Sequence, residues 1–290
     1  MLDRGWRWLA TGFVVAMFGI GAVIVSLTVF PVLRLGSRNA EAARLRIQLG
    51  MHRTFRLYVW GMKSLGLLTY EVHDVERLWQ PGQLVIANHP SLLDVVFLVS
   101  LMPRVDCIVK QGLWHNPFLR WPVAWASYIP NLSGETLVQE CAATLRRGNS
   151  LLVFPEGTRS YPGRPLLMQR GAAHVALESE APILPVTIQV SEPTLTKGYP
   201  WYRVPRRRPH FCIKVGEPWP PSVYNPGGQK GALAARRLTG LFGAYYAAAA
   251  GPGTVHSEGA GASGRAINDD EDTRRSSRAP ARDAGGPVRD

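Results

Sequence analysis

Cysteine is scarce in this chain of 290 residues, which contains only Cys107, Cys141 and Cys212. The three are widely spaced, odd in number and without a CxxC pair, which argues against a disulfide framework and against a zinc site. Reduced thiols in a cytosolic domain, packed as small apolar side chains, fit this pattern. The sequence therefore predicts a protein without disulfides and without a bound metal.

Acidic residues are also few. The chain contains 21 Asp and Glu and 33 Lys and Arg, which gives a formal net charge of +12. A basic chain favours anionic partners such as phospholipid surfaces, phosphorylated small molecules or acidic proteins. The sequence contains no zinc-finger spacing, RNA-binding aromatic motif or basic recognition helix, so we expect no nucleic-acid partner.

Charge is absent altogether from Leu9 to Leu33, a stretch rich in Val, Ile, Phe and Gly. As a helix with a rise of ~1.5 Å per residue, this stretch could cross a hydrocarbon core of about 30 Å. It is longer than the apolar core of a signal peptide, and no convincing cleavage site accompanies it, so residues 1–40 are interpreted as a retained membrane anchor. Pro31 and the internal glycines leave open a kinked or re-entrant helix.

Arginines flank this anchor more densely on its C-terminal side. Two precede it, Arg4 and Arg7, and five follow it: Arg34, Arg38, Arg44, Arg46 and Arg53. The positive-inside rule therefore places the rest of the chain in the cytoplasm.

Residues 41–250 are predicted to fold. Residues 41–69 alternate apolar and basic side chains in a helical pattern, and two interpretations remain open: an amphipathic helix at the membrane surface or a packing helix of the next domain. From residue 70 to residue 250, apolar runs alternate with helical stretches, which predicts an α/β domain. The predicted strands are Gln83–Ala87, Asp106–Val109, Leu151–Phe154, Ile183–Val190 and Phe211–Val215, and the predicted helices are Leu92–Leu101, Glu135–Arg147, Gly171–Glu178 and Gln229–Ala249. Residues 251–290 contain no aromatic side chain and few large aliphatic ones, which predicts a disordered tail.

An apolar strand runs directly into a polar turn and an apolar helix between Leu84 and Asp94. Pro90 suits a first helical turn, which places His89 at the strand-to-helix junction and Asp94 one and a half turns into the helix. The carboxylate could then reach the imidazole, fix its tautomer and stabilise the imidazolium. The other ring nitrogen would be a general base; the alternative is a capped helix with a structural histidine.

A second strand of the buried type, Leu151–Phe154, ends in the polar turn Pro155–Ser160. Gly157 permits close approach of the backbone to a ligand, and Arg159 offers a two-pronged donor for phosphate. Glu156 could hold Arg159 in place or accept a hydrogen bond from a substrate hydroxyl. Alone, such a turn is more typical of a loop than of a site.

Together, the two motifs resemble the glycerolipid acyltransferase family, which includes the lysophosphatidic acid acyltransferases. The first signature of that family is Asn-His, four residues and then Asp, which matches Asn88, His89 and Asp94. Its third signature is Phe-Pro-Glu-Gly-Thr-Arg, which matches Phe154–Arg159. The resemblance covers Tyr70 to Glu217 and implies a mixed β-sheet flanked by helices.

The resemblance also implies a reaction. In such enzymes the histidine deprotonates the acceptor hydroxyl, which attacks the thioester of acyl-CoA or acyl-carrier protein directly, while the arginine binds the acceptor phosphate. Carried over, His89 is the base and Asp94 its partner, and the substrate contacts fall on Glu156, Gly157, Thr158 and Arg159. The implied partners are membrane lipids and acyl-CoA or acyl-carrier protein, and no cofactor is needed beyond this acyl donor.

The second block of the family is incomplete in this chain. Lys110–Phe118 is recognisable, and Lys110 could bring positive charge to the site or be a solvated loop lysine. However, Ile129–Ser133 lacks the arginine that helps to bind glycerol phosphate in the family. This departure leaves the identity of the acceptor open.

Several alternatives therefore remain for the substrate and the role. The single anchor and the segment Lys197–Arg208, which mixes aromatic and basic residues, look like the subgroup encoded with bacterial aryl-polyene or pigment pathways. The acceptor could thus be an aryl-polyene-type lipid, or a lyso-ornithine lipid. The alternative outside enzymes is a non-catalytic lipid-binding membrane protein. For the enzyme, the predicted location is the cytoplasmic face of a bacterial inner membrane.

Overall fold

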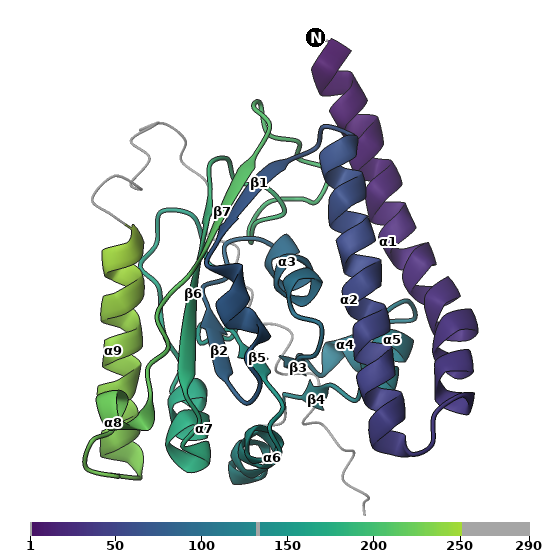
Figure 1. Cartoon of the computed structure of the whole chain (residues 1–290). Helices are drawn as coiled ribbons and strands as arrows, with labels where there is room; N and C mark the ends of the chain where they lie inside the picture. Colours follow the sequence, from purple (N-terminus) through teal and green to yellow (C-terminus); the bar gives the residue numbers. More distant parts are fainter. Residues whose placement is uncertain (1, 132–133, 251–290) are drawn as a thin grey trace, which may run out of the picture. The chain divides into compact units, whose positions relative to one another are not determined.

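A seven-stranded β-sheet flanked by helices forms the centre of the structure, a computed structural model that describes residues 2–131 and 134–250 (Figure 1). The strand order is β1-β7-β6-β2-β5-β3-β4, and in the described residues the pairs are parallel except for β6 with β7. The expected α/β fold with a mixed sheet is thereby confirmed. The predicted disordered tail, residues 251–290, lies outside the described residues. The strands are β1 (Thr69–His73), β2 (Leu84–Ala87), β3 (Asp106–Val109), β4 (Ile129–Pro130), β5 (Leu151–Val153), β6 (Ile183–Val190) and β7 (His210–Val215).

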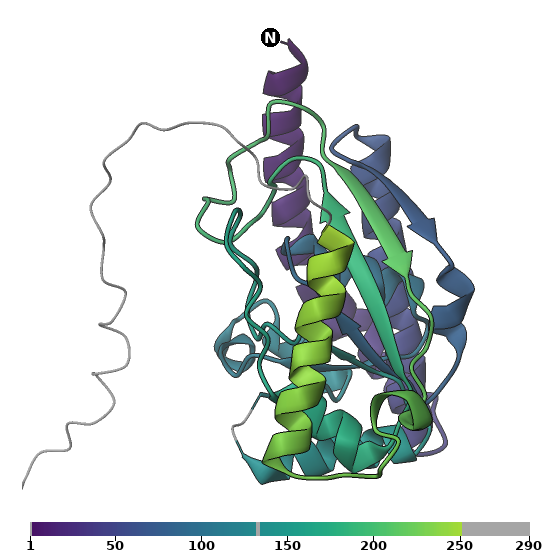
Figure 2. The ribbon, with the colours of Figure 1, turned by 90° about the vertical axis from the view of Figure 1, so that its left-hand side faces the viewer.

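Helices cover both faces of the sheet. Figure 1 shows α2 and α3 on one side of it and α7 and α9 on the other, and the view in Figure 2 places α9 in front of the strands. The α-helices are α1 (Leu2–Leu35), α2 (Ala40–Ser64), α3 (Leu93–Leu101), α4 (Gly112–His115), α5 (Arg120–Trp125), α6 (Glu135–Arg146), α7 (Gly171–Ser179), α8 (Pro221–Tyr224) and α9 (Ala232–Ala250), and a 3-10 helix, η1, spans Val75–Trp79.

The central strands are apolar throughout because both of their faces are buried. Successive side chains of a strand point to opposite faces of the sheet. Accordingly, Val85 of β2 packs in the core that contains Phe97 of α3. Its neighbour Ile86 packs in a second core with Ala173 of α7 and Phe242 of α9.

The first helix, α1, continues without a break through Pro31 and is long and apolar enough to cross a membrane. Ala10, Val14 and Phe30 are buried where it packs against the rest of the protein. A second set of large side chains recurs every three or four residues, which places them along one side of a helix. These side chains are all exposed: Trp6, Leu9, Phe13, Met17, Ile20, Ile24 and Leu27.

The polar N-terminal end of α1 is tied to the folded unit. The indole Nε1 of Trp6 donates to the carbonyl oxygen of Leu65 at 3.0 Å. The buried guanidinium of Arg7 donates to the carbonyl oxygens of Pro205 and Arg206 at 3.2 and 2.8 Å. Further along, α1 packs against α2 and α5. The helix therefore lies beside the folded unit and does not project away from it.

The second helix, α2, begins after Asn39, whose side chain accepts a hydrogen bond from the backbone N–H of Ala42 at 2.8 Å. It ends at Ser64, five residues before the end of the predicted helical region at residue 69, because Gly66 turns the chain with φ +72°. The helix α2 packs against α1 and α3. Its buried apolar side chains are Ala43, Ile47, Met51, Val59 and Met62.

Candidate active site

The predicted site residues gather where parallel strands end. His89 follows β2, Glu156 and its neighbours follow β5, and Lys110 follows β3. Because β2, β5 and β3 are adjacent and parallel, their carboxyl ends share one edge of the sheet. Asn131 after β4 and Lys197 after β6 reach the same edge. Five separate segments thus meet at one cavity.

The two residues proposed as the catalytic pair are in direct contact. The Nδ1 atom of His89 lies 2.9 Å from Oδ2 of Asp94. The side chain of Asp94 is fully buried, whereas that of His89 is 13% exposed and lines the cavity. The ring of Phe154 stacks on the imidazole, with centroids 4.1 Å apart and planes at 24°. These contacts leave Nε2 without a hydrogen-bond partner among the described residues, free to meet a substrate.

The position of Asp94 differs from the prediction in one respect. The helix α3 begins at Leu93, so Pro90 lies in the preceding turn and Asp94 in the first helical turn. There, Oδ2 of Asp94 also accepts a hydrogen bond from the backbone N–H of Ser91 at 2.7 Å. A carboxylate in the first turn of a helix is favoured by the helix dipole, and this one faces back towards His89.

The late start of α3 has a tertiary cause that local sequence does not reveal. The hydroxyl of Ser91 donates to the carbonyl oxygen of Thr194 at 2.8 Å. The N–H of Leu92 donates to the carbonyl oxygen of Leu195 at 3.1 Å. These bonds hold the turn against the segment after β6.

Burial governs the acidity of the two carboxyl groups near His89. Burial raises the pKa of Asp94 to about 6, although the hydrogen bond from His89 opposes this shift. Burial likewise raises the pKa of Glu156, against the hydrogen bonds from Ser160 and the backbone of His89. The second oxygen of Asp94, Oδ1, is buried and has no hydrogen-bond partner in the described residues.

Glu156 links the two sequence motifs. Its Oε1 accepts hydrogen bonds from the backbone N–H of His89 at 2.8 Å and from the hydroxyl of Ser160 at 3.0 Å. In return, the N–H of Ser160 donates to the carbonyl oxygen of His89 at 2.8 Å. The carboxylate thus holds the backbone of His89, which corrects the expectation that it would hold the guanidinium of Arg159.

The rest of the second motif lines the cavity. Gly157 has φ +67°, a conformation that favours glycine, and is followed by Thr158 and Arg159 along the cavity wall. The Nη1 atom of Arg159 donates to the carbonyl oxygen of Leu195 at 2.8 Å. This bond orients the guanidinium and leaves its other donors available to an anion.

The cavity has a volume of about 700 Å³, and its lining is partly cationic and partly apolar. Three cations contribute to it, Lys110, Arg159 and Lys197, and no Asp or Glu side chain of the described residues does. The rest of the wall is largely apolar and includes Leu92, Val95, Ile108, Leu113, Leu137, Val138, Leu152 and Val175. Such a lining can accept a molecule with an anionic head and a hydrocarbon chain.

Three contributors to the site were not predicted from the sequence. Lys197 belongs to the aromatic and basic segment that the sequence marks, and only the fold brings it to the cavity. Leu195 has φ +47° and accepts hydrogen bonds from both Leu92 and Arg159, for which the sequence contains no signal. Asn131 lines the cavity within the stretch that lacks the expected arginine; residues 132 and 133 lie outside the described residues.

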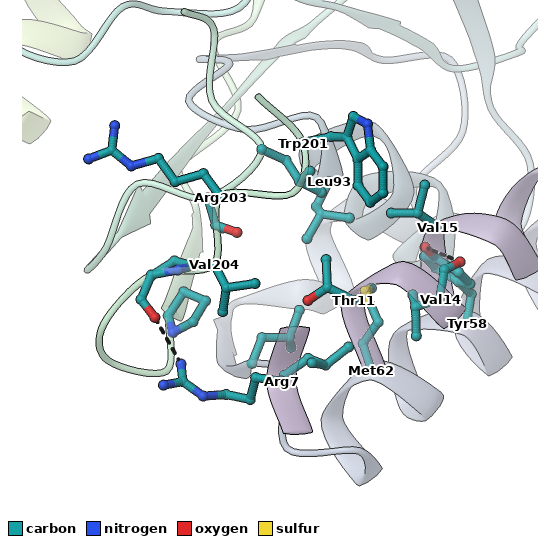
Figure 3. Close-up of a pocket in the computed structure, with 16 residues that line it drawn as sticks. Arg7, Thr11, Val14, Val15, Tyr58, Met62, Leu93, Trp201, Arg203 and Val204 are labelled. Carbon is teal, nitrogen blue, oxygen red and sulfur yellow. Dashed lines mark hydrogen bonds between the residues drawn. The ribbon is translucent and has the colours of Figure 1, made fainter. Parts of the chain in front are cut away.

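A second, smaller pocket of about 50 Å³ lies between α1, α2 and the segment after β6 (Figure 3). Figure 3 shows the guanidinium of Arg7 in its wall, hydrogen-bonded to the backbone of that segment. Neither His89 nor Asp94 lines this pocket. The larger cavity is therefore the candidate active site.

Comparisons with known proteins concern the part of the chain that carries this cavity. Residues 69–189 match the family model described as acyltransferase. The 1-acyl-sn-glycerol-3-phosphate acyltransferase of Saccharomyces cerevisiae is 33% identical over 159 residues, which cover 50% of this chain and 51% of that protein. The enzyme of the same name from Pseudomonas aeruginosa is 26% identical over 149 residues, which cover 49% and 58%. The chain thus spans about half the length of the curated relatives it matches.

The fold also has a solved counterpart. The crystal structure of the 1-acyl-sn-glycerophosphate acyltransferase from Thermotoga maritima superimposes with a TM-score of 0.58 over 86% of this chain and 96% of that chain. At 19% sequence identity, this likeness concerns the fold. The segment that matches the acyltransferase family model, residues 69–189, contains both motifs at the cavity and is similar to 1-acyl-sn-glycerol-3-phosphate acyltransferases.

Proposed function

We propose that the protein is an O-acyltransferase that moves an acyl chain from a thioester, acyl-CoA or acyl-carrier protein, to the hydroxyl of a lysophospholipid-type acceptor. The observation that carries this proposal is the pairing of His89 with Asp94 at 2.9 Å in a cavity with cationic and apolar walls. A lipid-binding scaffold would have no use for a buried carboxylate that orients an imidazole.

In the proposed reaction, Asp94 accepts a hydrogen bond from the Nδ1–H of His89, so that Nε2 is the basic nitrogen. Nε2 takes the proton of the acceptor hydroxyl as its oxygen attacks the thioester carbonyl. The tetrahedral intermediate then collapses, the carbon–sulfur bond breaks, and the thiolate receives the proton from the imidazolium. The products are an ester and a free thiol, and Asp94 stays ionised throughout.

Direct transfer is favoured over an acyl-enzyme intermediate. Cys107 is a thiol in the cavity wall. However, burial raises its pKa, which keeps the thiol protonated and weakly nucleophilic. The acceptor hydroxyl activated by His89 is the better nucleophile.

The decisive experiment uses the purified full-length protein in detergent micelles. Acyl-CoA and acyl-carrier protein donors are each combined with lysophosphatidate, with lyso-ornithine lipid and with no acceptor, and release of free thiol is measured together with the lipid product. We expect acceptor-dependent thiol release and a new diacyl lipid. If no donor and acceptor pair gives transfer, the protein is a lipid-binding module and the proposal fails.

The cationic side chains of the cavity, Lys110, Arg159 and Lys197, predict that phosphorylated acceptors bind more tightly than acceptors without phosphate. Substituting Arg159→Gln or Lys197→Ala should raise KM about 10–100-fold for a phosphorylated acceptor, because a hydrogen bond to a charged group contributes about 1.5–3 kcal/mol. With an acceptor that lacks phosphate, such as lyso-ornithine lipid, KM should change little. Steady-state kinetics on both acceptors test this.

The matched control for these variants is Arg164→Gln. Arg164 and Lys197 both lie over the ring of Tyr161, at 4.8 and 4.6 Å from its centroid, but Arg164 does not line the cavity. Its substitution should leave KM unchanged. An equal rise in KM for both acceptors would assign Arg159 and Lys197 to the donor or to the fold instead.

We further propose that α1 anchors the protein at the cytoplasmic face of a bacterial inner membrane. The exposed apolar stripe of α1 is suited to lipid, and the hydrogen bonds of Arg7 to Pro205 and Arg206 keep the N-terminal end beside the catalytic unit. Both ends of α1 should therefore lie on the same side of the bilayer, with the helix immersed in one leaflet.

Labelling with a membrane-impermeant maleimide tests this placement. A cysteine introduced at the exposed Arg4, in a Cys212→Ser background, should react only after the cells are opened. Cys107 and Cys141 are buried, so the Cys212→Ser protein without the introduced cysteine should not react with the maleimide. Labelling of intact cells would instead show that α1 crosses the membrane.

A further inference from the structure

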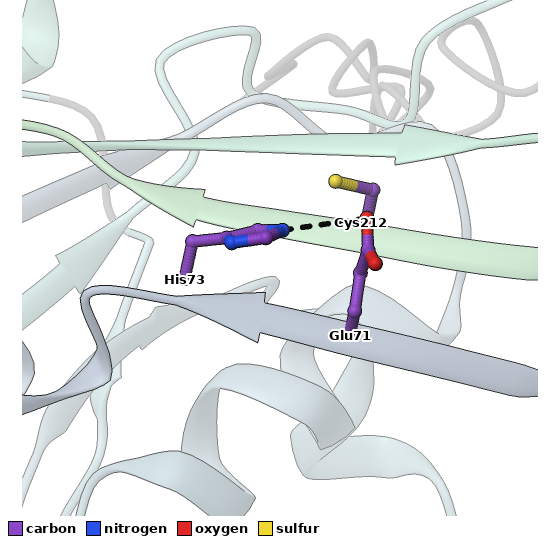
Figure 4. Close-up of side chains that lie close together, drawn as sticks. All are labelled: Glu71, His73 and Cys212. Atoms are coloured by element: carbon purple, nitrogen blue, oxygen red, sulfur yellow. Dashed lines mark ion pairs between the residues drawn. The ribbon is translucent and has the colours of Figure 1, made fainter.

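A second cluster of reactive side chains lies on strands β1 and β7, outside the catalytic cavity. Glu71 and His73 of β1 meet Cys212 of β7, and their potential ligand atoms all lie within 4.8 Å of one another. Figure 4 shows the three side chains converging from the two neighbouring strands. None of them lines the catalytic cavity, and acyl transfer does not require them.

The strand pairing explains why these side chains meet. In the parallel register, Glu71 is opposite Cys212, and His73 lies two residues further along the same face. The alternate residues, Tyr70 and Ile213, pack in the core on the other face. The cluster therefore faces outwards, where a dissolved ion can reach it.

A second histidine lies beside Glu71, outside the group of three residues whose donor atoms are all within 4.8 Å of one another. His210, on the same face of β7, places Nε2 3.8 Å from Oε1 of Glu71. Its Nδ1 lies 2.8 Å from the hydroxyl of Thr69. A hydrogen bond to the second ring nitrogen is how proteins orient histidines that bind metals. Nε2 of His210 is thus held near the carboxylate of Glu71.

The distances and the donor types both suit zinc. In a tetrahedral zinc site, bonds of about 2.0–2.3 Å place neighbouring donor atoms roughly 3.3–3.8 Å apart. Nε2 of His73 lies 3.3 Å from Oε1 of Glu71, and Nε2 of His210 lies 3.8 Å from the same oxygen. Two imidazoles, a thiol and a carboxylate favour zinc over magnesium or calcium, which prefer oxygen ligands.

We propose that Glu71, His73 and Cys212 form a zinc site that fastens β1 to β7, and that a movement of the His210 side chain towards the ion supplies the fourth ligand. The strand β1 is at the edge of the sheet and follows directly after α2, so the ion would secure the connection between the α1–α2 pair and the catalytic sheet. This proposal replaces the sequence prediction of a protein without a metal.

Cobalt provides a direct readout of such a site. Metal-free, full-length protein without a polyhistidine tag is titrated with Co²⁺ in detergent. We expect one equivalent to bind with the visible bands of tetrahedral cobalt and a near-ultraviolet thiolate-to-cobalt band, and Zn²⁺ to abolish both. Cys212→Ser should lose the thiolate band, and His73→Gln should weaken binding at least tenfold.

Lys214→Ala is the matched control. Lys214 is opposite His73 in the register and shares its face, so its removal spares all four donors and takes away a neighbouring positive charge. This variant should bind Co²⁺ as tightly as the wild type or more tightly. Acyl transfer, which does not involve the cluster, reports that each variant is folded. Absence of the cobalt bands in the wild type, or an unchanged thiolate band in Cys212→Ser, would overturn the proposal.

Discussion

Replacing His89 with alanine should lower kcat for acyl transfer by about 10²–10⁴-fold, the usual contribution of a general base. The side chain contacts Asp94 and the ring of Phe154, and its free nitrogen faces the cavity. Its loss leaves the cationic wall intact, so KM for the acceptor should change little. Initial rates of thiol release from the acyl donor, measured at several acceptor concentrations, separate the two effects.

His115→Ala is the matched control for this experiment. His115 ends the short helix α4, is exposed and does not line the cavity, so its substitution should leave kcat and KM unchanged. Thermal unfolding of both variants should resemble that of the wild type. A His89→Ala variant with near wild-type kcat would show that another group activates the hydroxyl, and the catalytic assignment would have to be abandoned.

The location of the site could be predicted because it depends on topology. His89 and Glu156 each follow an apolar strand. In α/β proteins, parallel strands of this kind place their carboxyl ends at one edge of the sheet. The structure adds the reciprocal bonds of His89 with Glu156 and Ser160, which join the two motifs. Those bonds depend on the adjacency of β2 and β5, which follows from the fold and not from either segment alone.

Other features depended on contacts between distant segments and were missed. The local pattern predicts Pro90 in the first helical turn, but hydrogen bonds to Thr194 and Leu195 hold Ser91 and Leu92 in a turn that precedes α3. Lys197 reaches the cavity only because β6 is parallel to β2.

The zinc proposal shows the same limit of sequence reasoning. Metal sites are found in sequences by short spacings between donors, such as CxxC. Glu71 and Cys212 are far apart in the chain and become neighbours only through the pairing of β1 with β7. The sequence around Cys212 therefore predicts only a small apolar side chain, because the partners of Cys212 are on another strand.

Asp94→Asn should abolish most activity without unfolding the protein. An asparagine oxygen in place of Oδ2 can still accept from His89 and from the N–H of Ser91, so the geometry is preserved. What is lost is the charge that stabilises the imidazolium. At about 4 Å and an effective dielectric constant of ~20, that attraction is about 4 kcal/mol, which corresponds to a fall in kcat of about 10³-fold.

In the wild type, stability and activity should change with pH in opposite directions. Asp94→Asn should lose this pH dependence of stability. Burial raises the pKa of Asp94 from its ordinary value of 3.8 to about 6, so the folded protein holds this proton more tightly than the unfolded chain. The stabilisation from that proton is complete below pH 3.8 and is lost as the pH rises through 6. Asparagine has no proton to lose, so the Tm of Asp94→Asn relative to the wild type should rise between pH 4 and pH 7.

Wild-type activity should fall as the pH drops below about 6, because protonated Asp94 no longer stabilises the imidazolium. Melting curves and initial rates at each pH give the two profiles from one preparation. A large loss of Tm in Asp94→Asn at pH 7 would mean that the buried charge supports the fold. Since Oδ1 has no hydrogen-bond partner among the described residues, we expect instead that this carboxylate is retained for catalysis at the expense of stability.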